Sequence, residues 1–291
     1  MNGLKYFLSI LSAILFFSNA PAAVYQIPVA SQLDRGWYDA LGNASPTNSE
    51  FGFGGNYTVG RTEAEVRNFF VFQIPTLHAS EKILRADFVI YCTPSEDGGY
   101  VSPDTNETFI LHSIDRTSIE TLRARDTNSA STNVFEDLGD GTPFNTPAIF
   151  TPASQDTEVT IPLNEAFLTL LSNRLGGELA FGGSINSLGD DPLIPEFLFG
   201  YSHHVPFDRT RLVITTTSIP LLSIQRRYTS QIEISWPTDF RYFILEQSDF
   251  LNPPNWTAVE LPREISNGQI TVTIDPTAPQ KFFRLRSPQD P

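Results

Sequence analysis

The recurrence of short apolar and aromatic runs between clusters of turn-forming residues most constrains the fold of this chain. In the first two thirds of the sequence, Pro75, Pro94, Asp97-Gly98-Gly99, Gly182-Gly183 and Pro206 bound such runs. Proline and glycine at these positions end strands and favour turns. The 22 prolines and 18 glycines argue for many turns rather than long helices. Many short strands predict a β-sandwich or barrel instead of alternating strands and helices.

Seven strands are predicted before residue 217. Some are apolar on both faces, as in Phe69-Phe70-Val71-Phe72, whereas Arg209–Ile214 alternates. Two packed antiparallel sheets require this mixture of doubly buried and half-exposed strands. We therefore expect residues 23–217 to form one jelly-roll-like antiparallel β-sandwich in an all-β protein. The predicted strands are Val66–Ile74, Ile83–Cys92, Thr108–Ile114, Glu158–Leu163, Glu178–Phe181, Glu196–Tyr201 and Arg209–Thr216.

Two short helices are predicted between these strands. Asn164 is a favourable N-cap for a helix over Glu165–Leu175, and Gly176 can end that helix in the left-handed conformation. Thr117-Ser118-Ile119-Glu120 is typical of a capping box that opens a shorter helix toward Arg125. One face of the first helix would carry Phe167, Leu170, Leu171 and Arg174.

Residues 218–291 have a tighter strand pattern and are expected to form a second, smaller β-sandwich after a linker at Thr217–Pro220. Ser266-Asn267-Gly268-Gln269 predicts a type I′ hairpin, because that turn needs two residues that accept positive φ. The size and strand count favour an immunoglobulin-like or fibronectin-III-like sandwich that lacks its last strand. Its strands are predicted near Leu221–Gln225, Ile232–Trp236, Tyr242–Gln247, Trp256–Leu261, Gln269–Ile274 and Lys281–Arg286.

The N-terminal residues 1–22 are predicted to be a signal peptide. Lys5 precedes an apolar stretch from Tyr6 to Phe17, and Ala20 and Ala22 supply the small residues of a cleavage site. An uncleaved anchor is the alternative, but the stretch is shorter than the roughly 20 residues that span a bilayer. We expect a secreted, extracellular protein without a transmembrane segment in the mature chain, with the periplasm or cell surface as other possible locations.

The acidic residues concentrate in the first region. Val24–Thr217 carries 25 acidic and 11 basic residues, and residues 218–291 carry eight acidic and seven basic residues. Nucleic acid and anionic lipid are disfavoured as partners because both bind to clusters of lysine and arginine. The single cysteine, Cys92, excludes an internal disulfide and ends an apolar strand, which predicts a buried side chain.

Several segments together resemble a family of secreted bacterial β-sandwich modules that often precede sorting tails of the Pro-Glu-Pro type. This chain lacks that tail and instead carries a region similar to the fibronectin-like repeats at the ends of large secreted bacterial proteins. The resemblance implies compartment and fold but no activity, and a looser likeness to carbohydrate-binding jelly rolls concerns fold alone. The family-like segments are Arg35-Gly36-Trp37-Tyr38-Asp39, Asn56-Tyr57 with Gly60, Arg67–Phe72, Gly99–Asp104 with Glu107-Thr108, Asp137–Thr142 and Glu196–Gly200; the fibronectin-like ones are Leu245–Ser248, Trp256-Thr257 and Phe282–Leu285.

Metal and catalytic motifs are weak. His203-His204 would point to opposite faces of an extended segment and so would not share a zinc ion. No cofactor is predicted apart from a possible structural calcium, for which loop carboxylates are the candidates. Turn chemistry is the competing explanation for these aspartates. The candidate calcium ligands are three pairs of aspartates: Asp137 with Asp140, Asp190 with Asp191, and Asp97 with Asp104.

Trp37, Tyr38, Tyr57 and Tyr100 lie in turn-rich segments and are the candidate ligand-binding residues. Exposed rings there could stack on sugars, and the alternative is that they cap the ends of the sandwich. No catalytic residue is predicted. The leading hypothesis is a secreted, non-catalytic binding or adhesion protein with a polysaccharide or surface glycan as its ligand. The alternatives are a structural component of the cell envelope or extracellular matrix, and an extracellular hydrolase.

Overall fold

The computed structural model describes residues 23–46, 55–78, 80–127, 130–227, 231–275 and 280–286. The chain divides into a larger compact unit, made of Ala23–His78 and Ile83–Thr216, and a smaller one that includes Thr217–Pro291. The predicted signal peptide, residues 1–22, lies outside the described residues. Within the described ranges, no helix has the length and apolar character needed to cross a membrane.

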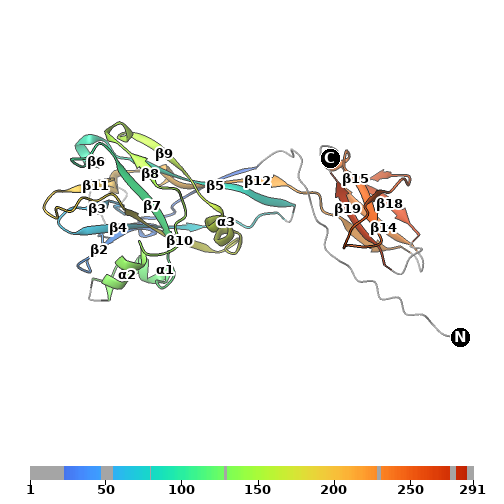
Figure 1. The fold of residues 1–291 in the computed structure, drawn as a ribbon, viewed down its shortest axis with the longest axis horizontal. Helices are drawn as coiled ribbons and strands as arrows, with labels where there is room; N and C mark the ends of the chain where they lie inside the picture. Colours follow the sequence, from blue (N-terminus) through green and yellow to red (C-terminus); the bar gives the residue numbers. More distant parts are fainter. Residues whose placement is uncertain are drawn as a thin grey trace. The chain divides into compact units, whose positions relative to one another are not determined.

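Two antiparallel sheets form the larger unit (Figure 1). The four-stranded sheet has the order β1-β12-β5-β9, and the eight-stranded sheet follows the path β6-β11-β3-β4-β10-β7-β8, with β2 also paired to β4. The strands are β1 (Val24–Pro28), β2 (Arg35–Asp39), β3 (Val59–Arg61), β4 (Glu65–Gln73), β5 (Glu81–Cys92), β6 (Tyr100–Val101), β7 (Glu107–Ser113), β8 (Ala148–Phe150), β9 (Thr157–Pro162), β10 (Glu178–Ile185), β11 (Glu196–Leu198) and β12 (Thr210–Ser218).

The chain alternates between these two sheets in the manner of a jelly roll. When β1, β4, β5, β7, β8, β9, β10 and β12 are counted one to eight, the sheets have the orders 1-8-3-6 and 2-7-4-5. This arrangement of two Greek keys places the first and last strands side by side. The prediction of an all-β fold is confirmed.

A layer of phenylalanine rings fills the space between the sheets. Phe70 and Phe181 come from the larger sheet and Phe88 from the smaller. The ring centroid of Phe88 lies 4.8 Å from that of Phe70 and 5.2 Å from that of Phe181. All three side chains are fully buried. Tilted and edge-on ring contacts of this kind add to the stabilisation from burial.

Two helices cover the other face of the larger sheet. These are α1 (Ile119–Ala124) and α2 (Ser131–Asp137), which bury a second apolar cluster against β2 and β4. Phe69 and Val71 of β4 belong to this cluster, and they alternate with residues that face the inner core. The helical cover explains why β4 is apolar on both faces. The cluster consists of Tyr38, Phe69, Val71, Leu122, Val134, Phe135 and Leu138.

A third helix, α3 (Glu165–Ser172), begins where it was predicted. The side chain of Asn164 accepts hydrogen bonds from the backbone N–H groups of Ala166 and Phe167. The helix ends three residues before the predicted Leu175, and Gly176 follows with a φ of 77°. Among the described residues, six short 3-10 turns cover Gln32–Asp34, Ser95–Asp97, Pro152–Ser154, Ser202–His204, Phe207–Arg209 and Thr238–Phe240.

The smaller unit also consists of two antiparallel sheets, with the orders β13-β14-β18-β17 and β16-β15-β19. Trp236, Ile234 and Leu285 are buried in its core. Asn267 and Gly268 have φ values of 50° and 74°, so the predicted hairpin turn is confirmed. The strands are β13 (Ser223–Arg226), β14 (Ile232–Pro237), β15 (Ile244–Ser248), β16 (Thr257–Ala258), β17 (Glu264–Ser266), β18 (Gln269–Ile274) and β19 (Phe282–Arg286).

Candidate binding groove

The segment that joins β7 to α1 is held in place by one buried carboxylate. Asp137, at the end of α2, accepts hydrogen bonds from the backbone N–H groups of Asp115, Arg116 and Thr117 at 2.7–3.3 Å. Ser118 then caps α1 by accepting from the N–H of Thr121 at 3.2 Å. The two helices that cover the sheet are therefore tied together at this point.

Asp137 remains charged in this position. Burial by itself would raise the pKa of its carboxyl group, but hydrogen bonds from the Thr117 side chain and from the backbone outweigh burial and lower it. Arg116 bridges this carboxylate and that of Asp140, with nitrogen–oxygen distances of 3.3 and 2.6 Å. Both carboxylates are thus engaged by donors of the protein itself.

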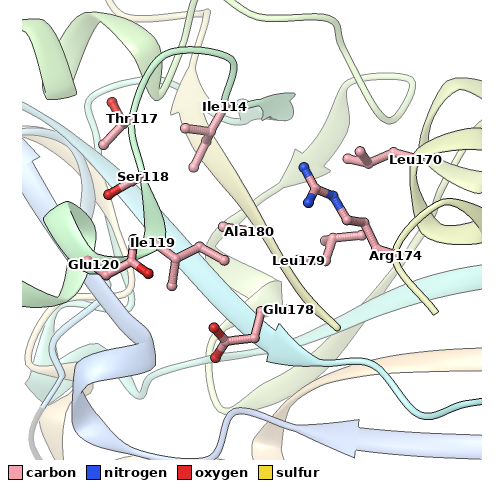
Figure 2. A pocket seen from close by; sticks show the side chains of 10 residues that line it. All are labelled: Ile114, Thr117, Ser118, Ile119, Glu120, Leu170, Arg174, Glu178, Leu179 and Ala180. Carbon is pink, nitrogen blue, oxygen red and sulfur yellow. The ribbon is translucent and has the colours of Figure 1, made fainter. Parts of the chain in front are cut away.

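A hollow of about 410 Å³ opens beside the start of α1, where that helix, α3 and β10 meet. Figure 2 shows the guanidinium of Arg174 on one side of the hollow and the carboxylates of Glu120 and Glu178 on the other. Between these charged groups the lining is largely apolar, with Thr117 and Ser118 as neutral polar members. The apolar members are Ile114, Ile119, Leu170, Leu179 and Ala180.

The charged groups of this hollow differ in how they are held. Glu178 accepts a hydrogen bond from Arg123 at 2.6 Å, and Arg123 also pairs with Asp34 at 2.6 Å. Hydrogen bonds from its own backbone N–H and from Ser118 lower the pKa of Glu120, so its exposed carboxylate is charged at neutral pH. Arg174 is exposed on the segment that follows α3. The hollow therefore combines a cation and two anions around an apolar lining.

A second hollow, of about 670 Å³, adjoins the first and shares Thr117 and Ser118 with it. Its remaining lining is more polar: Arg116 comes from the connecting segment, Thr121 from α1, Asn133, Val134 and Glu136 from α2, and Asp140 from the residues that follow α2. We refer to the two hollows together as the α1 groove. Ligand sites typically occupy roughly 300–1,000 Å³ and combine apolar walls with a few polar groups, and each hollow is within that range.

The four aromatic residues predicted to bind sugars do not form an exposed surface. Tyr38, Tyr57 and Tyr100 are 1%, 0% and 8% exposed. Trp37 is partly buried and lies on the face of β2 opposite to Tyr38, because successive side chains of a strand point to opposite faces. The expectation that exposed rings gather at these residues is therefore wrong for the three tyrosines.

Each buried tyrosine has a structural contact instead. The hydroxyl of Tyr38 donates to the carbonyl of Thr121 at 2.9 Å, which ties β2 to α1. The Tyr57 hydroxyl donates to the carbonyl of Tyr91 at 3.0 Å, and the Tyr100 hydroxyl donates to the carbonyl of Asp104 at 2.8 Å. The rings of Tyr57 and Tyr100 belong to the core between the sheets, and that of Tyr38 belongs to the cluster under the helices.

The remaining calcium candidates lie in turns. Asp191 accepts from the N–H of Leu193 at 2.9 Å, the local bond of an Asx turn. Asp190 is next to it, and Asp97 and Asp104 lie in separate loops. Across the parts of the chain that the structure describes, no group of three or more His, Cys, Asp or Glu side chains is placed to hold a metal ion.

The histidines also take defined positions. His203 and His204 lie in a 3-10 turn with ring centroids 4.0 Å apart, so the prediction that they point to opposite faces is wrong. An extended segment would separate the rings, whereas the turn brings them together. His112 contacts the carbonyl of Gly141 and the hydroxyl of Ser184 through its two ring nitrogens, and burial lowers its pKa. It is a strand histidine whose two ring nitrogens both have partners.

Sequence reasoning did not find the α1 groove. Its lining comes from residues 114–121, 133–140 and 170–180, which the fold brings together over one face of the larger sheet. The available signals were the cap at Ser118 and an arginine, Arg174, on the apolar face predicted for α3. Neither signal indicates which other segment lies opposite.

No protein-family model matches the chain, and no curated protein gives a significant match to it. Fold and groove together define the larger unit as an antiparallel jelly-roll sandwich with a solvent-open hollow on its helix-covered face. This hollow has an apolar lining with charged and hydroxyl groups around it. It is the candidate binding site.

Proposed function

We propose that the protein is a secreted, non-catalytic binding or adhesion protein whose larger unit takes a glycan in the α1 groove. The observation that carries the proposal is the pairing of an apolar lining with charged and hydroxyl side chains in one open hollow. A sugar ring presents an apolar face and a rim of hydroxyls, so it can use both kinds of group at once. Arg174 would donate to ring or hydroxyl oxygens, and Glu120 would accept from hydroxyls.

Hydrolysis of a glycan is supported less well by the same groups. A glycosidase needs one carboxyl group with a raised pKa to act as a general acid. The pKa of Glu120 is shifted in the opposite direction, and Glu178 is paired with Arg123. A chromogenic glycoside panel would test this alternative, and turnover that is lost in both Glu120→Gln and Glu178→Gln would establish it.

The smaller unit fits a role as a spacer. Counted in chain order from β13, its sheets have the orders 1-2-6-5 and 4-3-7, which correspond to strands A-B-E-D and C′-C-F of an immunoglobulin-type sandwich. This order supports an immunoglobulin-like or fibronectin-III-like unit. Its charge is nearly balanced, whereas the larger unit is strongly acidic. The larger unit is thus the better candidate for specific recognition.

The proposed location rests on residues 1–22, whose sequence supports export and cleavage. An acidic surface suits an exported protein, because a net charge far from zero keeps proteins soluble. A structural role in an envelope or matrix is the alternative, and concentration-dependent self-assembly in light scattering, without glycan binding, would favour it.

A glycan array with the mature chain, residues 23–291, tests the main proposal. We expect at least one neutral glycan to bind, and the Arg174→Ala variant to bind it about tenfold more weakly, as for loss of one central contact. Arg241→Ala, an exposed arginine in the smaller unit, is the matched control and should retain the wild-type affinity. If the wild-type chain binds nothing on the array or in polysaccharide pull-downs, the proposal fails.

A further inference from the structure

The loop between β11 and β12 displays three rings next to one another. Tyr201 is 63% exposed, His204 is exposed and His203 is partly buried. The centroids of Tyr201 and His203 are 5.9 Å apart with their planes at 63°, and those of His203 and His204 are 4.0 Å apart with their planes at 45°. We refer to these three residues as the ring platform. It shares no lining residue with the α1 groove.

The backbone beneath the platform is strained. Phe199 and Tyr201 have φ values of 61° and 45°, in the left-handed region that favours glycine. Phe199 is fully buried among the core rings, so packing explains its side chain. Tyr201 has no such explanation, because its ring is mostly in solvent. Such outliers persist where the surrounding structure enforces them, and they cluster at functional sites.

Several hydrogen bonds enforce this conformation. The hydroxyl of Thr58 donates to the carbonyl of Phe199 at 3.1 Å, and the hydroxyl of Thr93 donates to the carbonyl of Gly200 at 2.8 Å. On the following residue, the Ser202 hydroxyl donates to Asn56 Oδ1 at 2.7 Å. The backbone of the loop is therefore held by side chains from other parts of the larger unit.

Neighbouring backbone atoms also leave no room for a side chain at position 200 of this loop. A Cβ atom added at Gly200 would lie 2.5 Å from the carbonyl oxygen of Asp97 and 2.7 Å from that of Gly98. The Gly200 N–H donates to that Gly98 carbonyl at 3.0 Å. The two loops are thus in backbone contact, so the ring platform rests on a rigid base.

We infer that Tyr201, His203 and His204 form a second glycan contact, in which the apolar face of a neutral pyranose ring stacks on Tyr201 and the two inclined histidine rings flank it. The inference rests on the proposed glycan-binding function, but it assigns a separate surface. A loop backbone that is held in advance loses little entropy on binding, and aromatic faces favour apolar sugar faces. Burial and the neighbouring His204 lower the pKa of His203, so this ring is neutral at pH 7.

The surrounding charge argues for a neutral ligand. The region up to Thr217 has 25 acidic and 11 basic residues, so it repels polyuronates and other anionic polymers. Stacking needs no charge on the ligand. The ring platform is therefore expected to prefer neutral polysaccharides over anionic ones of similar length.

Affinity gel electrophoresis of the full mature chain tests this inference, with xylan, mannan and mixed-linkage β-glucan as neutral probes and polygalacturonate as the anionic probe. We expect retardation by at least one neutral probe and none by polygalacturonate. Tyr201→Ala should weaken retardation about tenfold, whereas Tyr201→Phe should keep it. Tyr242→Ala removes a tyrosine of similar exposure from the smaller unit and should have no effect.

Tyr201→Gly separates recognition from folding. Glycine adopts a φ of 45° without strain, so the urea midpoint of this variant should stay equal or rise while retardation is lost. Retardation that survives in both Tyr201→Gly and Tyr201→Ala would overturn the ring platform. If Arg174→Ala loses binding and the Tyr201 variants keep it, the glycan binds in the α1 groove and the ring platform is wrong. If no probe retards the wild-type chain and the glycan array is also negative, both the ring platform and the proposed function are wrong.

Discussion

The guanidinium carbon of Arg35 lies 5.1 Å from the ring centroid of Tyr57, and both side chains are completely buried. Nη2 of Arg35 donates to the carbonyl of Val205 at 2.5 Å, and the Tyr57 hydroxyl donates to the carbonyl of Tyr91. Burial lowers the pKa of Arg35 to about 10 and raises that of Tyr57 above its ordinary range. At neutral pH a charged guanidinium therefore contacts a neutral phenol inside the sandwich.

Replacement of Tyr57 tests whether this ring is structural. Tyr57→Phe removes one buried hydrogen bond and should lower the free energy of unfolding by about 1 kcal/mol. Tyr57→Ala also leaves a cavity and should cost about 3–5 kcal/mol. Urea unfolding measures both values. Glycan binding should be unchanged in Tyr57→Phe, and a selective loss of binding in that variant would restore Tyr57 as a ligand-binding residue.

Asp137→Asn tests the carboxylate that holds the segment before α1. Three backbone N–H groups lose a charged acceptor, so we expect the free energy of unfolding to fall by about 2–4 kcal/mol at pH 7. Asp140→Asn is the control, since its side chain is 45% exposed and pairs with Arg116 at the surface. That change should cost less than about 1 kcal/mol. Equal effects of the two variants would contradict the role given to Asp137.

The same residue predicts a pH dependence. Its pKa is lower in the folded chain than the roughly 3.9 of an unfolded aspartate. The stabilisation is therefore fully present above about pH 4 and is lost as the pH falls through the lowered folded value. Urea midpoints of the wild type and Asp137→Asn should converge in strong acid. A difference that stays constant down to pH 2 would exclude this linkage.

Much of the larger sandwich could be predicted because local pattern and tertiary packing agree there. The predicted strand Val66–Ile74 lies at Glu65–Gln73, and its two apolar faces are both used. The short strands β2 and β3 were missed, since Arg35–Asp39 mixes charged and aromatic residues and Val59–Arg61 is only three residues long. Their pairing with β4 depends on long-range register, which period-two patterns do not reveal.

The ring platform was harder to predict for the same physical reason. Tyr57 and Tyr201 both lie beside turn residues, yet one is fully buried and the other is 63% exposed. The difference arises from the backbone. Tyr201 has a left-handed conformation, and this directs its side chain out of the core. Ring exposure is thus decided by loop geometry that composition does not encode.

Gly182→Ala tests the contact between α2 and the sheet. A Cβ atom there would lie 2.3 Å from the carbonyl oxygen of Leu138, so the end of α2 must move. We expect a loss of about 1–3 kcal/mol, with weaker binding in the adjoining groove. Gly177→Ala is the matched control, because its Cβ would meet Arg174 at an ordinary 3.5 Å. Equal stabilities of the two variants by urea unfolding would show that α2 does not need this close approach.

Glu246 should be the main electrostatic contact of the smaller unit. Its side chain is 8% exposed and accepts from Nε of Arg284 and Nε of Arg286, each at 2.7 Å. Burial alone would raise the pKa of Glu246, but these two hydrogen bonds lower it. Its contribution is therefore present above about pH 4.3, the unfolded value, and is lost as the pH falls through the folded one.

Glu246→Gln should destabilise the smaller unit by about 2–4 kcal/mol, because two arginines lose a largely buried partner. Tryptophan emission can follow this unit in a Trp37→Phe background, which leaves only Trp236 and Trp256, both of the smaller unit. Glu233→Gln is the control, since Glu233 lies 3.6 Å from Arg227 at a more exposed position and should contribute less than about 1 kcal/mol. A midpoint unchanged by Glu246→Gln would contradict the assignment.

Cys92 offers a direct measure of how tightly the larger unit is closed. It is the single cysteine of the chain, it is fully buried at the end of β5, and its thiol donates to the carbonyl of Gly99 at 3.2 Å. Burial raises its pKa to about 12, so very little thiolate exists at pH 8. Because the thiolate is the reactive form, the folded protein should resist iodoacetamide.

Modification should therefore require opening of β5, and its rate should depend on urea as unfolding does. A variant that loosens the same unit, such as Gly182→Ala, should react faster in proportion to its lower free energy of unfolding, because labelling follows the population of the open form. Glu246→Gln affects the other unit and should leave the rate unchanged. Rapid labelling of the wild-type chain without urea would show instead that the sandwich opens locally around Cys92.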